Sequence, residues 1–134
     1  MHVKIIFYLL GLLFSIIPAL AQDKNSACVE NFKVDSRTEM GANYLNDILV
    51  EWSYTTPKNK KVHVVIEVQP LDACWDKLEG INRGELRTYR FDDKSVKQLR
   101  IEHLDLNAKC LRWRAIITKG KCTEVTDWKF EQFV

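Results

Sequence analysis

The four cysteines are the residues of this 134-residue chain whose types and spacing bear most directly on chemistry. A structural zinc site needs cysteines or histidines in closely spaced pairs, and the intervals here are all long. An even cysteine count in a short chain is instead typical of a disulfide framework. We therefore expect two disulfides and no metal, and the spacing leaves all three pairings open. The residues are Cys28, Cys74, Cys110 and Cys122.

Few other side chains suggest catalysis. Apart from His2, the histidines are His63 and His103. Neither belongs to a metalloprotease motif or to a recognisable Ser-His-Asp triad pattern, and the sequence has no glycine-rich phosphate loop. We expect a protein that is not an enzyme and needs no cofactor. Lys and Arg number 20 against 18 Asp and Glu, and this near balance argues against general nucleic-acid binding.

The N-terminus has the three parts of a cleaved secretory signal peptide. Lys4 supplies a positive start, Ile5 to Ile17 is an uncharged apolar run, and Ala19-Leu20-Ala21 is a small-residue cleavage site. A membrane-spanning helix needs about 20 apolar residues, so this run is too short to be an anchor. We expect a signal peptide at 1–21 and one secreted domain at 22–134. Disulfides persist in that oxidising environment.

Beyond the signal, apolar and polar residues alternate with a period of two, which indicates half-buried β-strands. We place core residues on these strands at Val50, Trp52, Ile66, Leu99 and Trp113. Pro70 is expected to end a strand because it cannot donate to the ladder. Short strands with frequent turns predict an all-β sandwich. The expected strands are Asp47–Tyr54, Val62–Val68, Val96–Leu104, Leu111–Ile117 and Thr126–Phe133, with shorter ones at Cys74–Asp76 and Leu86–Phe91.

Three segments resemble a fibronectin type III domain. Ile48-Leu49-Val50-Glu51-Trp52 is similar to the family's strand B, and Leu111 to Gly120 is similar to its strand F. Thr123 to Phe130 resembles its last strand. Cys110 falls at or beside the position where the family has a tyrosine that ties down the corner before strand F. The resemblance implies a seven-stranded antiparallel β-sandwich of fibronectin type III or immunoglobulin-like type.

Strand F also resembles that of class I cytokine-receptor domains, in which arginines stack on tryptophans. Arg112 and Arg114 alternate along the strand, and Trp128 is the one tryptophan in the stretch that would carry the receptor motif. The double-tryptophan motif itself is absent from this chain. Two readings of Trp128 remain open: it stacks on an arginine, or it faces the core.

The fold implied by the resemblance also selects a disulfide pairing. In that topology Cys28 and Cys122 lie at one pole, and Cys74 and Cys110 lie at the other. A disulfide requires Cα atoms about 4.4–6.8 Å apart, whereas a strand of five or six residues spans about 17–20 Å. Each bridge must therefore join cysteines at the same pole, so we expect Cys28–Cys122 and Cys74–Cys110.

The same topology gathers lysines that are scattered in the sequence. Two turns, one between the expected strands Asp47–Tyr54 and Val62–Val68 and one after strand F, meet at one pole, which we call the basic pole. Such a cluster attracts an acidic glycan or an acidic protein face; alternatively, these are ordinary solvated loop lysines. The lysines of the basic pole are Lys58, Lys60, Lys61, Lys119 and Lys121.

The sequence thus predicts a secreted, monomeric recognition module that binds an extracellular protein or glycan through its loops or a sheet face. Loops carried by a rigid sandwich are common binding elements. A lipid or small-ligand carrier that opens between its sheets is the alternative. The four tryptophans would suit such a carrier, but they fall where a packed fibronectin core, or its strand edge, would also place them.

Overall fold

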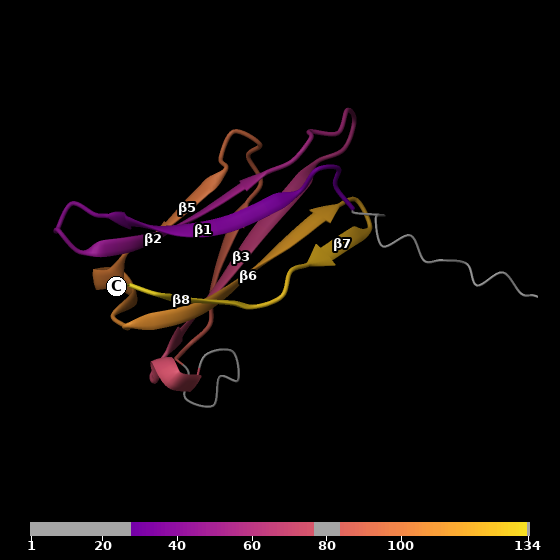
Figure 1. Ribbon diagram of the computed structural model, residues 1–134. Coiled ribbons are helices and arrows are strands. Elements are labelled where there is room, and N and C mark those ends of the chain that lie inside the picture. The colour runs from indigo at the N-terminus through magenta and orange to yellow at the C-terminus, as the bar shows by residue number, and fades with distance from the viewer. Residues whose placement is uncertain (1–27, 77–83, 134) are drawn as a thin grey trace, which may run out of the picture.

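The computed structural model describes residues 28–76 and 84–133, so the predicted signal peptide at 1–21 lies outside the described residues. The described part is all-β and contains two antiparallel sheets, a three-stranded one ordered β1-β2-β5 and a five-stranded one ordered β4-β3-β6-β7, with β8 also paired to β6 (Figure 1). The strands are β1 (Lys33–Met40), β2 (Asn46–Ser53), β3 (Val62–Leu71), β4 (Arg87–Phe91), β5 (Gln98–Ile101), β6 (Cys110–Lys119), β7 (Cys122–Val125) and β8 (Lys129–Gln132).

One core lies between the two sheets. Alternate residues of β2, β3 and β6 point into it, as their period of two predicts. Trp52 of the first sheet and Ile66 and Trp113 of the second are buried in the same cluster, together with Val50. Leu99 packs against this cluster but is only half-buried, because β5 is an edge strand. The Trp52 ring also contacts the Phe91 ring, with centroids 4.9 Å apart.

Pro70 does not end its strand, contrary to the sequence-based expectation. β3 continues to Leu71, and Pro70 pairs with Leu111 of β6. The Pro70 carbonyl accepts a hydrogen bond from the Gly84 backbone N–H at 2.8 Å, so the backbone polar groups of Pro70 face away from β6. Proline has no backbone N–H to donate, but this position lies beyond the end of β4, so the ladder between β3 and β4 loses no hydrogen bond.

Three other segments differ from the prediction. Cys74–Asp76 is a 3₁₀ turn rather than a strand. The strand expected at Val96–Leu104 ends at Ile101, and a helical turn, α1 (His103–Leu106), follows and ends at Asn107 in a left-handed conformation. The strand expected at Thr126–Phe133 is shorter, as β8 (Lys129–Gln132), and β7 (Cys122–Val125) before it occupies the neighbouring part of the same edge of β6. β1 and β7 were not among the expected strands, so the described residues contain eight strands instead of seven.

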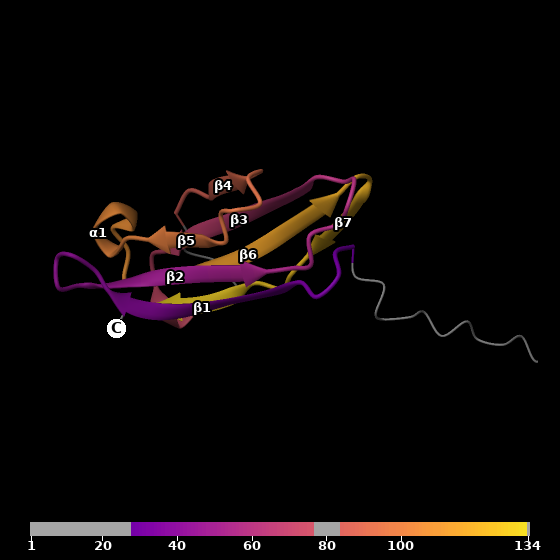
Figure 2. The same cartoon turned by 90° about the horizontal axis from the view of Figure 1, so that it is seen from above.

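Two disulfides connect the strands at opposite poles of the molecule. Cys28 is bonded to Cys122 with a Cα–Cα distance of 5.6 Å, and Cys74 to Cys110 with a distance of 5.7 Å. These are the two pairs that the sequence-based topology predicted. The first bridge lies beside the β6–β7 turn. The second lies at the other end of β6. The loop between β1 and β2 lies at this same end of the molecule (Figure 2).

Candidate functional site

The basic pole is formed by the connection between β2 and β3 and by the turn between β6 and β7. Lys58 and Lys119, one from each segment, line the same hollow of about 280 Å³. Lys60 and Lys61 line a neighbouring hollow of about 640 Å³. Lys121 is exposed in the β6–β7 turn, next to the disulfide at Cys122. The fold thus brings two separate lysine groups to one pole, as expected.

Local structure fixes these lysines on the pole. The β6–β7 turn has two residues between the paired Lys119 and Cys122, and Gly120 supplies the left-handed backbone, φ 59°, that such a turn requires. On the other connection, the Thr55 backbone N–H donates to the Glu30 carbonyl at 2.9 Å. This bond ties the β2–β3 connection to the segment that the Cys28–Cys122 disulfide holds.

Charged side chains from the β4–β5 connection complete the larger hollow, and the sequence analysis missed them. Lys94 lines it beside Asp92 and Asp93. His63 Nδ1 and Asp92 Oδ1 lie 2.5 Å apart, and Arg90 also donates to this carboxylate. The His63 hydrogen bond, followed by the Arg90 bond, lowers the pKa of Asp92.

Both acids are thus engaged by partners other than the lysines. The Ser95 backbone N–H donates to Asp93 and lowers the pKa of that carboxyl. Within residues 28–76 and 84–133, none of the five predicted lysines forms an ion pair. Glu30 lines the smaller hollow with Lys58 and Lys119 but forms no ion pair with them in the described part of the chain. The geometry therefore places five ammonium groups without ion pairs among the described residues at one end of the domain. These lysines are Lys58, Lys60, Lys61, Lys119 and Lys121.

Trp128 stacks on arginines rather than facing the core. Its ring centroid lies 4.3 Å from Arg112 Cζ and 4.4 Å from Arg114 Cζ. Arg112 donates to Gln69 Oε1 from Nε and Nη2, at 2.9 and 2.7 Å, and Arg114 pairs with Glu67. Because Arg112 is buried, this stack stabilises the outer face of the five-stranded sheet.

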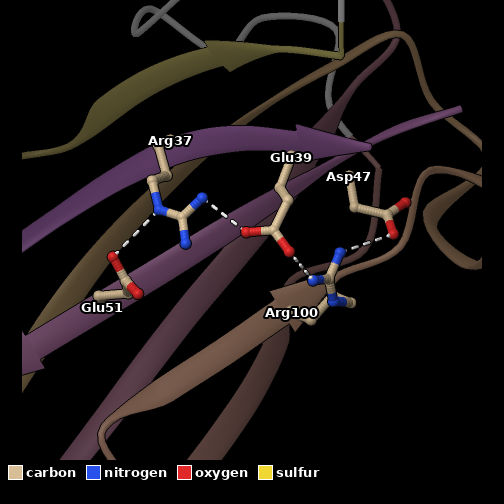
Figure 3. A network of polar contacts seen from close by, with 5 residues as sticks. All are labelled: Arg37, Glu39, Asp47, Glu51 and Arg100. Carbon is tan, nitrogen blue, oxygen red and sulfur yellow. Dashed lines mark hydrogen bonds and ion pairs between the residues drawn. The ribbon is translucent and has the colours of Figure 1, made fainter. Parts of the chain in front are cut away.

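The outer face of the three-stranded sheet carries a second polar network that sequence analysis did not find (Figure 3). Arg100 lies between Glu39 and Asp47, with distances of 2.6 and 3.2 Å. Arg37 pairs with both Glu39 and Glu51. Hydrogen bonds from Arg100, then Arg37, lower the pKa of Glu39. No sequence motif marks this network, because its members meet only through the register of β1, β2 and β5.

The side chains considered for catalysis have other contacts. His63 pairs with Asp92, and the His103 ring stacks on Phe133 with centroids 4.5 Å apart. All four cysteines are in disulfides. In the described part of the chain, no group of three or more His, Cys, Asp or Glu residues is placed to hold a metal ion. There, too, no helix is long and apolar enough to cross a membrane.

Comparison of the chain with protein-family models, with curated proteins and with solved structures finds no match.

Proposed function

We propose that the chain is a secreted, non-catalytic recognition module of fibronectin type III type, and that its basic pole binds an acidic extracellular partner, with a sulfated glycan as the best-fitting chemistry. Two disulfides are typical of an oxidising environment, which supports secretion. The arrangement of two antiparallel sheets, β1-β2-β5 opposite β4-β3-β6-β7, supports a sandwich of this kind.

The convergence of lysines that form no ion pair within residues 28–76 and 84–133 is the single observation that carries the proposed binding site. Lys58 and Lys119 are far apart in sequence but line one hollow. Clustered cations at the end of a rigid domain raise the local concentration of anions, and the attraction weakens as salt increases. A flexible polyanion can contact both hollows at once, because Lys60 and Lys61 lie in the adjoining one.

Heparin-affinity chromatography of the oxidised 22–134 domain tests this proposal. The wild type should be retained at low salt and released by moderate salt. Lys60→Glu and Lys119→Glu should each elute earlier, and the double variant should not be retained. Lys109→Glu is the matched control, since it makes the same change in net charge at an exposed position near the Cys74–Cys110 end and should elute with the wild type.

Two results would contradict the proposal. The wild-type domain could pass through the column at low salt, which would leave only the solvated-loop reading of these lysines. Lys109→Glu could reduce retention as much as Lys60→Glu, which would make the interaction a response to net charge rather than to the basic pole.

The carrier alternative has no observation in its favour. It requires space between the sheets, and the side chains that would have to part are Trp52, Ile66 and Trp113, all of which are buried in one packed cluster. Copurification of an apolar ligand with the oxidised domain would support the carrier reading.

A further inference from the structure

Exposed apolar side chains gather at the end of the molecule opposite the basic pole. Met40, Tyr44 and Leu104 are 64%, 86% and 60% exposed. Met40, Leu45 and Leu104 line one hollow of about 290 Å³ between the β1–β2 loop and the segment that leads from β5 into α1. We call this surface the hairpin pole and define it by Met40, Tyr44, Leu45 and Leu104. Contiguous exposed apolar groups are often interaction sites.

The loop that presents Tyr44 is well ordered by its own hydrogen bonds. The Gly41 N–H donates to the Leu45 carbonyl at 2.7 Å, and the Tyr44 N–H donates to the Gly41 carbonyl at 3.2 Å. Gly41 is needed here, because a Cβ at this position would lie 2.3 Å from Asp47 Oδ2. The network in Figure 3 holds that carboxylate through Arg100.

Tyr44 itself is not explained by the turn or by packing. Its backbone is left-handed, with φ 58°, a conformation that glycine and asparagine adopt at lower cost. Its side chain is almost fully exposed and so contributes little to the core. An exposed aromatic residue held on a hydrogen-bonded loop has the character of a binding hot spot, because little side-chain freedom is lost when it binds.

The charges around the hairpin pole specify the complementary chemistry. Glu102 lines the hollow and forms no ion pair within the described residues. Two acidic residues, Asp47 and Glu102, and one basic residue, Arg100, line this hollow. Arg100 pairs with Asp47 and with Glu39, and Glu39 pairs with Arg37 as well. Acidic groups therefore exceed basic ones beside the apolar side chains. A membrane surface rich in anionic lipids would be repelled, whereas a partner with a positive charge next to an apolar group would be attracted.

We propose that the hairpin pole binds a peptide segment of a partner protein, which places one apolar side chain in the hollow and a lysine or arginine beside Glu102. The hollow is large enough for one such anchor. Because Glu102 and the apolar residues line the same hollow, the two groups of the ligand must be close together, as neighbouring residues of one segment are.

Selection from a displayed library of random 12-residue peptides, with the oxidised 22–134 domain as bait, tests this proposal. The expected peptides share an apolar residue within two positions of a lysine or arginine. Tyr44→Gly and Leu104→Ser should each weaken binding of a selected peptide about tenfold or more, as loss of a hot-spot side chain does. Glu102→Gln should weaken it about threefold and reduce its salt dependence, as expected for an exposed ion pair.

Two controls distinguish a defined site from unfolding and from a general response to exposed apolar surface. Glycine suits the left-handed backbone at position 44, so Tyr44→Gly should keep the melting temperature of the wild type, and its lost binding cannot then be attributed to unfolding. Val125→Ser removes an apolar side chain that is 50% exposed on β7, away from the hairpin pole, and should bind like the wild type. The Lys60→Glu and Lys119→Glu variants should also bind normally, which makes this site independent of the proposed glycan site.

Several outcomes would overturn the proposal. Selection could yield no enriched peptide, or peptides without a basic residue. Binding could survive both Tyr44→Gly and Leu104→Ser. Sedimentation could instead show self-association that Tyr44→Gly abolishes, in which case a second copy of the chain is the occupant.

Discussion

Replacement of Trp128 by alanine should destabilise the domain by about 1–3 kcal/mol, although this side chain lies outside the core. The ring stacks on Arg112 and Arg114, and each exposed cation–π contact contributes about 0.5–1 kcal/mol. The two contacts therefore account for about 1–2 kcal/mol, and the loss of packing against the buried stem of Arg112 adds to this. The melting temperature should fall by about 4 °C or more per kcal/mol for a domain of this size.

Urea unfolding followed by far-ultraviolet circular dichroism is the appropriate assay, since the substitution removes a fluorophore. A double-mutant cycle of Trp128→Ala with Arg114→Ala isolates the pair from the contact between Arg114 and Glu67. We expect a coupling energy of about 0.5–1 kcal/mol. Independent additive effects, or a Trp128→Ala variant as stable as the wild type, would refute the reasoning that the stack holds the outer face of the five-stranded sheet.

Three further measurements address other parts of the fold. Trp52→Ala should lower the free energy of unfolding by about 3–5 kcal/mol, and near-native stability would contradict the central place of this residue in the core. Joint replacement of Cys74 and Cys110 by alanine should cost about 2–4 kcal/mol, and an unchanged urea midpoint would argue against this bridge. The pKa of Glu39 is lowered in the folded state, chiefly by Arg100. The stability that this ion pair contributes is therefore present above the unfolded pKa of Glu39, about 4.3, and is lost as the pH falls through the lower folded pKa. Glu39→Gln should flatten the pH dependence of the urea midpoint in this acid range. A pH profile identical to that of the wild type would contradict the ion pair.

The central strands could be predicted because burial on one face imposes a period of two. β2, β3 and β6 alternate in this way, and Val50, Ile66 and Trp113 were assigned to the core from that pattern. The disulfide pairs then followed from strand direction, because the length of a strand separates the two poles. Burial can be read directly from the sequence pattern, whereas the distance argument for the disulfides also needed the topology that the family resemblance implies.

The peripheral elements could not be predicted by the same reasoning. β1 (Lys33–Met40) reads as mostly polar because its outward side chains join the network with β2 and β5. β7 and β8 share one edge of β6, and the break between them places Trp128 over the arginines. Strand propensity carries no information about such a break, where the Ala115 N–H donates to the Thr126 hydroxyl instead of to a backbone carbonyl of the ladder.

The two candidate binding sites also differed in how far the sequence predicted them. The convergence of the basic pole followed from topology, although Lys94 joins through a connection whose path the sequence did not predict. The hairpin pole was not predicted at all. Met40, Tyr44 and Leu104 are apolar or aromatic, and a sequence pattern assigns such residues to the interior. They are exposed because the β1–β2 loop and α1 hold them at the surface, and the positions of these segments are known only once the fold is built.

The formal net charge of +2 does not show how unevenly the charged side chains are distributed over the molecule. In the part of the chain that the structure describes, lysines without ion pairs gather at one pole, and an apolar surface with an acidic margin occupies the other. β3 has 10 residues and runs between these ends, so at about 3.3 Å per residue the poles lie roughly 30 Å apart. This separation exceeds the Debye length of about 8 Å at physiological salt. An anion bound at the basic pole would therefore leave the potential at Glu102 almost unchanged, and the domain could hold an acidic glycan and a basic peptide segment at the same time.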